Sequence, residues 1–261
     1  MPTTPLTKEK LDEILSSCDV KARISFDPVQ FVHKYADPED QEVVAFLASS
    51  LAYGKVAQIL KNMNRLLDLL ASGARDGPAR AVDRFEPRSH GKRFSHFVHR
   101  FHNGPAVMDL FGRLRKIRRD YGTIEAFFLE GWGPGTGMRH ALESFSGRLR
   151  ALPPKIEKLT FLYPSPESGS ACKRMNLFLR WMVRPADGLD LGLWKSLSPS
   201  RLIIPLDTHI SRIAHQLGLT KRTSGDWRTA EEITESLRHF DPEDPLRYDF
   251  ALCHLGISGV L

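Results

Sequence analysis

Two residues in the C-terminal third of the chain carry side chains that can act together on a sugar carbon. Lys173 opens the amphipathic segment KRMNLFLRWMVR, and Asp207 stands where a second such segment, THISRIAHQLGL, begins. A primary amine can attack a sugar C1′, displace the base and stay attached as a Schiff base. A carboxylate beside it can stabilise the positive charge that develops on the sugar ring as the base leaves. The pair predicts a lysine nucleophile with an aspartate partner.

Two helices are expected to position this pair. Apolar residues recur at helical spacing in both segments, which predicts helices near 171–184 and 207–217. Asp207 follows a proline and a leucine and precedes the second helix, so it is also a predicted N-cap. The two roles are compatible, because backbone N–H groups that bind a carboxylate also hold it in place.

The turn before Lys173 is expected to bind DNA. Gly169, Ser170 and Ala171 lead into the lysine helix. A glycine-containing turn at a helix start presents free backbone N–H groups, and the helix dipole adds positive potential. Such a turn can bind a phosphate without reading the base sequence, which would hold a DNA strand near the lysine.

The remainder of the chain is also expected to be helical. Alternating apolar and polar runs of strand length are scarce, and Asp-Pro pairs signal helix starts at 27–28, 37–38 and 244–245. We therefore predict an all-α protein. The further helices are expected near 7–17, 28–35, 39–52, 55–70, 92–117, 122–129, 137–150, 155–162, 227–238 and 245–257.

Composition is that of an ordinary globular protein. The 261 residues are 41% hydrophobic and 26% charged, with a net charge of +6, which is compatible with a polyanionic partner. No run is long and apolar enough for a membrane span or a signal peptide, so no membrane partner and a cytoplasmic location are expected. Cys18, Cys172 and Cys253 have no paired spacing, which favours reduced thiols and argues against a four-cysteine iron–sulfur cluster.

Two clusters of polar residues have more than one interpretation. Segment 113–119, RLRKIRR, is either a solvated helix face or a patch that faces phosphates. His96, His99 and His102 recur at every third position, and three imidazoles can bind zinc. Because that spacing drifts around a helix and no carboxylate is interleaved, a stripe facing DNA or solvent is favoured, and no metal site is predicted.

The lysine helix and the segment IPLDTH (204–209) together resemble the helix-hairpin-helix DNA glycosylase superfamily, which includes endonuclease III and the 8-oxoguanine glycosylases. Residues 173–194 are similar to a bacterial family related to the archaeal 8-oxoguanine glycosylases, and residues 45–59 resemble the helix that borders the damaged-base pocket. The resemblance covers about half of the chain. It implies that Lys173 is the nucleophile and Asp207 the second catalytic residue.

The resemblance also implies a fold and an activity. The fold would be all-α and two-lobed, with the active site in the cleft between the lobes. Lobe A would comprise about 1–71 and 208–261, lobe B about 136–207, and an insert of about 72–135 is unassigned. We expect a bifunctional glycosylase and lyase in DNA repair, associated with the nucleoid, that acts as a monomer on damaged double-stranded DNA. An oxidised purine such as 8-oxoguanine is the first substrate expectation, and no cofactor is needed.

A flipped base needs an aromatic face and convergent polar groups. The candidates for stacking are Tyr53, Trp181 and Trp194, although Trp181 fits equally well beneath its own helix. The candidates for bonds to base edges are Ser49, Asn176 and Asp190, and those for phosphate or sugar contacts are Lys55, Arg184 and His209.

Two departures from the family pattern support an alternative interpretation. Ala171 stands where the hairpin G-x-G-x-K usually has its second glycine, and Leu51 replaces a glutamine that is common in the pocket helix. The alternative is a non-catalytic helix-hairpin-helix DNA-binding protein that has lost glycosylase activity. A third interpretation is a metal-dependent hydrolase of a small nucleotide that uses the histidine stripe.

Overall fold

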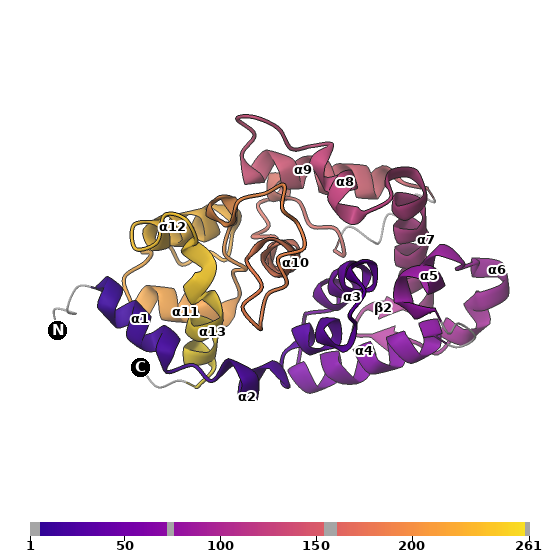
Figure 1. Cartoon of the computed structure of the whole chain (residues 1–261), viewed down its shortest axis with the longest axis horizontal. Helices are drawn as coiled ribbons and strands as arrows, with labels where there is room; N and C mark the ends of the chain where they lie inside the picture. Colours follow the sequence, from indigo (N-terminus) through magenta and orange to yellow (C-terminus); the bar gives the residue numbers. More distant parts are fainter. Residues whose placement is uncertain (1–5, 72–75, 154–160, 259–261) are drawn as a thin grey trace. The chain divides into compact units, whose positions relative to one another are not determined.

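The structure, a computed structural model, describes residues 6–71, 76–153 and 161–258, and this part of the chain is largely helical (Figure 1). The all-α prediction is confirmed. Within these ranges the only sheet is an antiparallel pair of two-residue strands, β1 (Val98–His99) and β2 (His102–Asn103). No helix in the described part of the chain is long and apolar enough to cross a bilayer.

The chain divides into two compact units. Unit 1 comprises Met1–Ala22 and Pro164–Leu261, and unit 2 comprises Arg23–Tyr163. These bounds differ from the lobes expected from the sequence, because residues 72–135 fall within unit 2 together with the helices that precede them. The short helix α2 (Val20–Ile24) spans the boundary between the units.

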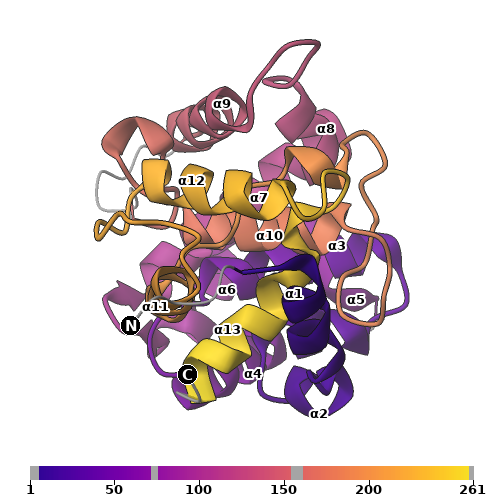
Figure 2. The same ribbon diagram turned by 90° about the vertical axis from the view of Figure 1, so that its left-hand side faces the viewer.

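Unit 1 is built around one buried helix. Its elements are α1 (Lys8–Ser16), η4 (Pro166–Ser168), α10 (Lys173–Val183), η5 (Pro199–Arg201), α11 (Thr208–Gln216), α12 (Trp227–Arg238), η6 (Pro245–Tyr248) and α13 (Asp249–Ser258). Every residue of α10 after Lys173 is buried, so this helix has no solvent-facing side. Helix α13 packs against both α11 and α1 (Figure 2). A central helix of this kind fixes the position of the residue at its start.

Unit 2 also surrounds a buried helix. Its elements are η1 (Pro28–Lys34), α3 (Pro38–Ser50), α4 (Val56–Ala71), α5 (Gly77–Asp83), α6 (Pro87–His90), η2 (Gly91–Phe94), β1, β2, α7 (Gly104–Tyr121), α8 (Ile124–Leu129) and α9 (Met138–Ala151). Helix α3 is buried from Glu42 to Ser50, and it packs on η1 and α5. The carboxylate of Glu42 accepts bonds from the backbone N–H groups of Ile124 and Glu125 at 2.9 and 3.0 Å, which joins the start of α8 to α3.

Helices begin at all three Asp-Pro pairs that the sequence signals. Asp27 and Asp37 each accept a backbone N–H bond at an N-cap, at 2.9 and 2.8 Å, whereas Asp244 occupies an N-cap position with no such bond. The predicted helix 92–117 is wrong in its first part. Residues 98–103 form the β1–β2 hairpin instead, and α7 begins at Gly104, where Asn103 is the N-cap. The helix expected at 155–162 lies mostly outside the described residues.

Candidate functional site

Lys173 is the first residue of α10 and the most accessible residue of that helix. Its side chain is 30% exposed, while the helix that follows is buried in unit 1. Cys172 just before it has φ +51°, a left-handed conformation that non-glycine residues seldom adopt. The abrupt change of direction at Cys172 brings the lysine to the surface at the end of a fixed helix.

The turn before Lys173 is braced from several sides. Gly169 has φ +79°, which a glycine adopts without strain, and its carbonyl accepts a bond from Trp227 N at 3.2 Å. The Cys172 N–H donates to Ser170 Oγ at 3.1 Å, and Asn176 Nδ2 donates to Ala171 O at 3.0 Å. The turn is therefore well fixed. The Cys172 amide already has an internal partner and Ala171 is buried, which does not favour the predicted phosphate contact at these two positions.

Asp207 is the N-cap of α11, as the sequence predicts. Its Oδ1 atom accepts bonds from the backbone N–H groups of His209 and Ile210, at 2.9 and 3.0 Å. The carboxylate is partly exposed, with 26% of the side chain accessible. Because both helix bonds go to Oδ1, the side chain is held in one orientation while Oδ2 keeps its capacity to interact elsewhere.

The structure brings Lys173 and Asp207 together, with Lys173 Nζ 3.9 Å from Asp207 Oδ2. This is longer than a hydrogen bond, so the two groups face each other as a loose ion pair. Both stand at helix N-termini, where the backbone dipoles favour negative charge. The arrangement places an amine and a carboxylate side by side at an accessible surface of unit 1.

A buried chain of ion pairs connects the lysine helix to its neighbours. Arg180, two turns after Lys173, lies 2.5 Å from Asp249 at the start of α13 and 3.2 Å from Asp190 in the loop after α10. Burial raises the pKa of the Asp249 carboxyl, while the charge of Arg180 opposes that rise. Because α13 packs on α11, which begins beside Asp207, these pairs tie the two helices of the site to one frame. Asp249 was not predicted from the sequence, although an acid followed by the apolar run FALC is an unusual pattern that could have indicated it.

Two of the predicted contact residues belong to this buried chain. Arg184 makes a two-pronged pair with Asp244 and a close bond to Asp190, whose side chain is fully buried. The Asp190 carboxylate is enclosed by the guanidinium groups of Arg180 and Arg184, so it has no oxygen turned toward a base edge. The Arg184 guanidinium has three carboxylate neighbours, so its charge is already neutralised. These contacts favour structural roles for Asp190 and Arg184 over the predicted base and phosphate contacts.

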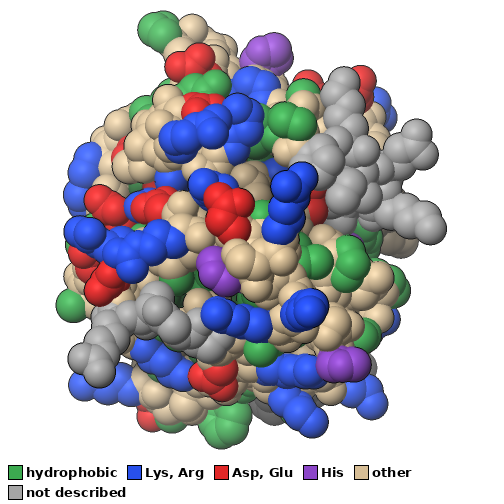
Figure 3. Space-filling model, turned by 90° about the vertical axis from the view of Figure 1, so that its right-hand side faces the viewer, with side chains coloured by type: hydrophobic (Ala, Val, Ile, Leu, Met, Phe, Trp, Pro, Cys, Tyr) green, Lys and Arg blue, Asp and Glu red, His purple; other side chains and the backbone are tan. Residues whose placement is uncertain are grey.

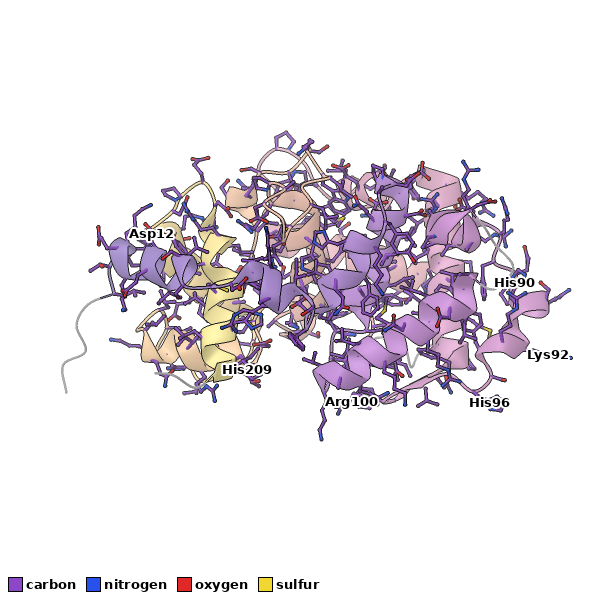
Figure 4. The ribbon with its side chains drawn as sticks, turned by 60° about the horizontal axis from the view of Figure 1, so that its bottom comes forward. Asp12, His90, Lys92, His96, Arg100 and His209 are labelled. Atoms are coloured by element: carbon purple, nitrogen blue, oxygen red, sulfur yellow. The ribbon has the colours of Figure 1, made fainter. Side chains whose placement is uncertain are left out.

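The remaining candidates in unit 1 differ in accessibility. Trp181 and Trp194 are buried, and the Trp194 ring meets Phe178 edge-on at 5.2 Å, so both tryptophans pack inside the unit. Asn176 is buried and supports the turn through Ala171. His209 is partly exposed two residues after Asp207 (Figure 4), which leaves it the best placed of the predicted phosphate contacts in this unit.

The other candidates lie in unit 2. Ser49 is buried and donates to the carbonyl of Phe46 within its own helix, at 3.1 Å. Lys55 is exposed just before α4. Tyr53 is partly exposed, and its hydroxyl donates to His99 O at 3.1 Å. Unit 2 therefore carries one accessible aromatic and one accessible cation from the predicted set.

The basic segment of α7 is paired with acids. Arg113 is buried against Asp109, and Arg118 bonds Asp83 and Glu39. The remaining cations make exposed pairs with Glu86 or Asp120, namely Arg115, Lys116 and Arg119. These pairs favour a structural role over a phosphate-facing patch.

The histidine stripe is not helical. His99 and His102 are buried in the β1–β2 hairpin, where Asn62 and Tyr53 respectively contact their Nδ1 atoms, while His96 is exposed. Within the described ranges no group of histidine, cysteine and acidic side chains is arranged to hold a metal ion.

Comparison with known proteins gives one family. Residues 27–258 match the model of a family described as "Protein of unknown function (DUF2400)". The matched region covers most of the chain and includes both Lys173 and Asp207. Neither the curated proteins nor the solved structures gave a match.

Proposed function

The chain belongs to the DUF2400 family, and we propose that this member is a DNA glycosylase and abasic-site lyase. The observation that carries the proposal is the distance of 3.9 Å between Lys173 Nζ and Asp207 Oδ2, with both side chains accessible. An amine and a carboxylate at this spacing are the two groups that base excision through a Schiff base requires. The proposal includes the helix-hairpin-helix glycosylase fold, which the turn–helix placement of Lys173 and the N-cap placement of Asp207 support.

The proposed chemistry begins at C1′ of a damaged nucleotide. The Lys173 nitrogen forms a bond to C1′, the C1′–N bond to the base breaks, and one amine proton leaves with the base. The nitrogen lone pair then displaces O4′ from C1′, which opens the sugar ring. O4′ takes a proton from water, and the nitrogen keeps its remaining proton as a protonated Schiff base. Loss of a proton from C2′ breaks the bond between C3′ and its phosphate oxygen, and the strand is cleaved by β-elimination.

Asp207 acts on the positive charge that builds on the sugar before the amine bond is complete. A reacting carbon must come within roughly 3–3.5 Å of the nucleophile. A sugar carbon that approaches Lys173 Nζ on the side facing Asp207 also lies close to Asp207 Oδ2, because Nζ and Oδ2 are only 3.9 Å apart. The bonds from His209 and Ile210 hold the carboxylate in place, so it need not reorganise as charge develops.

The proposed substrate is damaged double-stranded DNA. Extruding a base from the duplex costs a few kcal/mol, and the cost is lowest for damaged or mispaired bases, which gives such a site its first selectivity. An oxidised purine is the first expectation, and it rests on the resemblance to 8-oxoguanine glycosylases. The alternative, a DNA-binding protein without glycosylase activity, predicts DNA binding that does not depend on Lys173 and no base release.

The proposal is tested by base release from labelled duplexes that carry 8-oxoguanine, uracil, thymine glycol or an abasic site. The wild type should release at least one base and nick the abasic duplex, and Lys173→Gln should do neither while it still binds DNA. Lys195→Gln, which removes another exposed lysine of unit 1, is the matched control and should behave as wild type. Undiminished base release by Lys173→Gln would refute the proposal, and DNA binding with no release from any duplex would favour the alternative.

A further inference from the structure

The tip of the β1–β2 hairpin carries an arginine and a phenylalanine in an uncommon conformation. Arg100 and Phe101 are the two residues between the paired His99 and His102. Arg100 has φ +54°, a value seldom found outside glycine and a source of strain in an arginine. The hairpin beneath the tip is fixed, because Asn62 of α4 donates to Val98 O at 3.1 Å and contacts the His99 ring at 2.8 Å.

Three aromatic rings gather at this tip. The Phe101 and Tyr53 rings are nearly parallel, with centroids 5.7 Å apart and an angle of 15° between their planes. Phe161 meets both rings edge-on, at 5.1 Å from Phe101 and 5.0 Å from Tyr53. The Tyr53 hydroxyl is fixed by the His99 carbonyl and the His102 ring, so the stack rests on a rigid base.

This cluster is open to solvent instead of forming part of the core. Phe101 is 65% exposed and Phe161 is 44% exposed, and both are among the most exposed large apolar side chains of the described residues. An aromatic surface kept out of the core points to a binding role, since burying those rings would have stabilised the fold. The Arg100 guanidinium lies over the Phe101 ring, 5.3 Å from its centroid, and its stem lies against Gly54.

The surrounding segment is basic and free of acids. Residues 87–108 contain four Arg or Lys and no Asp or Glu. Among the described residues Arg88, Lys92 and Arg100 make no ion pair, in contrast to the paired cations of α7. Figure 4 shows Arg100 pointing away from the ribbon, with Lys92 and His96 further along unit 2. Lys and Arg side chains also gather in the lower part of the face in Figure 3, with few carboxylates among them.

We propose that Phe101, Tyr53 and Arg100 form a stacking site for an unpaired nucleobase of DNA, with Arg100 and Lys55 on the adjoining phosphates. A base has a flat π-face that matches the exposed Phe101 ring, and a phosphodiester matches cations that make no ion pair within the described residues. Arg100 already covers Phe101, and on binding the base takes the place of the guanidinium, which moves to the backbone. The choice of DNA over another nucleic acid rests on the proposed function. The geometry of the stacking site is independent of that function.

The test measures binding by fluorescence anisotropy to three labelled DNAs of one sequence. They are a single strand, a fully paired duplex, and a duplex with a tetrahydrofuran abasic analogue that leaves one base unpaired. Phe101→Ala should weaken binding to the single strand and the abasic duplex by about tenfold, with a much smaller effect on the paired duplex. Phe26→Ala removes an equally exposed phenylalanine of unit 2 and should change nothing. Arg100→Gln should weaken binding to all three and reduce the slope of log K against log salt by about one.

The outcomes separate this inference from the proposed function. Wild-type binding by Phe101→Ala, an equal loss on paired and unpaired DNA, or no DNA binding by the wild-type protein would each overturn the stacking site. Tighter binding to an RNA strand of the same sequence would overturn the choice of DNA. Base release that depends on Lys173, together with full binding by Phe101→Ala, would sustain the proposed function and remove the stacking site. Weaker binding of Phe101→Ala to unpaired DNA alone, with no base release by the wild type, would sustain the stacking site and remove the proposed function.

Discussion

Asp207 uses its two carboxylate oxygens for different partners. Oδ1 accepts two backbone N–H bonds from the start of α11, and Oδ2 faces Lys173 Nζ at 3.9 Å. The helix thus fixes the orientation of the carboxylate, and the second oxygen is left beside the amine. A capping role and a catalytic role can therefore be separated by substitutions that keep one and remove the other.

Asp207→Asn and Asp207→Ala should differ in stability but not in activity. Asparagine keeps a side-chain oxygen that caps α11, so its effect on the free energy of unfolding should be small, whereas alanine should cost about 1 kcal/mol. Both remove the negative charge beside Lys173, so base release should fall by about 10²–10³ fold in both. Denaturant unfolding and single-turnover base release measure the two effects. Asp226→Asn, at the N-cap of α12, is the matched control and should retain full activity.

Removal of the buried Arg180 side chain should destabilise the protein. Arg180→Met leaves Asp249 buried without its counter-charge, at a cost of about 3–5 kcal/mol near neutral pH. Arg139→Met, which breaks an exposed pair with Glu143, should cost less than about 1 kcal/mol. Thermal melting of both variants tests this ranking.

The cost of Arg180→Met should depend on pH. Burial raises the pKa of Asp249 in the folded protein, and loss of Arg180 removes the charge that opposes this rise. A carboxyl pKa that is higher in the folded state stabilises the folded protein at pH values below the unfolded-state pKa of about 3.9. This stabilisation is lost as the pH rises through the folded-state pKa. The deficit relative to wild type should therefore be smaller at pH 5 than at pH 7. A deficit that does not change with pH would mean that Asp249 does not carry the effect.

The stability that Asp226 contributes should be lost only in strong acid. Hydrogen bonds from the Thr229 backbone and the Ser224 hydroxyl hold the pKa of Asp226 well below its usual value. A lowered carboxyl pKa contributes stability that is full above the unfolded value of about 3.9 and is lost as pH falls through the folded pKa. The stability difference between wild type and Asp226→Asn should be constant between pH 5 and 7 and should shrink only in stronger acid. A difference that already falls between pH 7 and 5 would contradict this assignment.

Substitution of Gly54 should destabilise the protein, because its backbone is left-handed and Arg100 lies against it. Gly54 has φ +99°, and a Cβ atom there would lie 2.8 Å from Arg100 Cδ. Gly54→Ala should therefore destabilise the protein by roughly 1–2 kcal/mol through the left-handed backbone alone, and it should also displace Arg100. Gly112→Ala is the control: nothing lies near that position in α7, so it should stabilise the helix by about 0.5–1 kcal/mol. Thermal melting of both variants should show shifts of opposite sign.

Local signals in the sequence predict the helices of the site and the position of each of its two main residues at a helix start. Asp207 as an N-cap follows from an acid before an amphipathic segment, and Lys173 as the first residue of α10 follows from the glycine-containing turn before it. Both features depend on neighbours within a few residues. Hydrophobic periodicity likewise indicates the buried helices without any knowledge of what they pack against.

Features that depend on distant partners were not predictable in this way. His99 and His102 have a spacing that suggests a helix, but Asn62 and Tyr53 hold their rings in a hairpin. Arg118 pairs with Asp83 and Arg184 with Asp244, which lie 35 and 60 residues away in the sequence, and these partners favour structural roles for both cations. Periodicity along one segment contains no information about such partners.

The most direct test of the proposed function is borohydride trapping on duplexes that carry 8-oxoguanine, uracil, thymine glycol or an abasic site. The Schiff base predicts a covalent protein–DNA adduct with the wild-type protein, located at Lys173 by peptide mass spectrometry, and no adduct with Lys173→Gln. An adduct that persists in Lys173→Gln, or one that maps to another lysine, would contradict the assignment of Lys173 as the nucleophile.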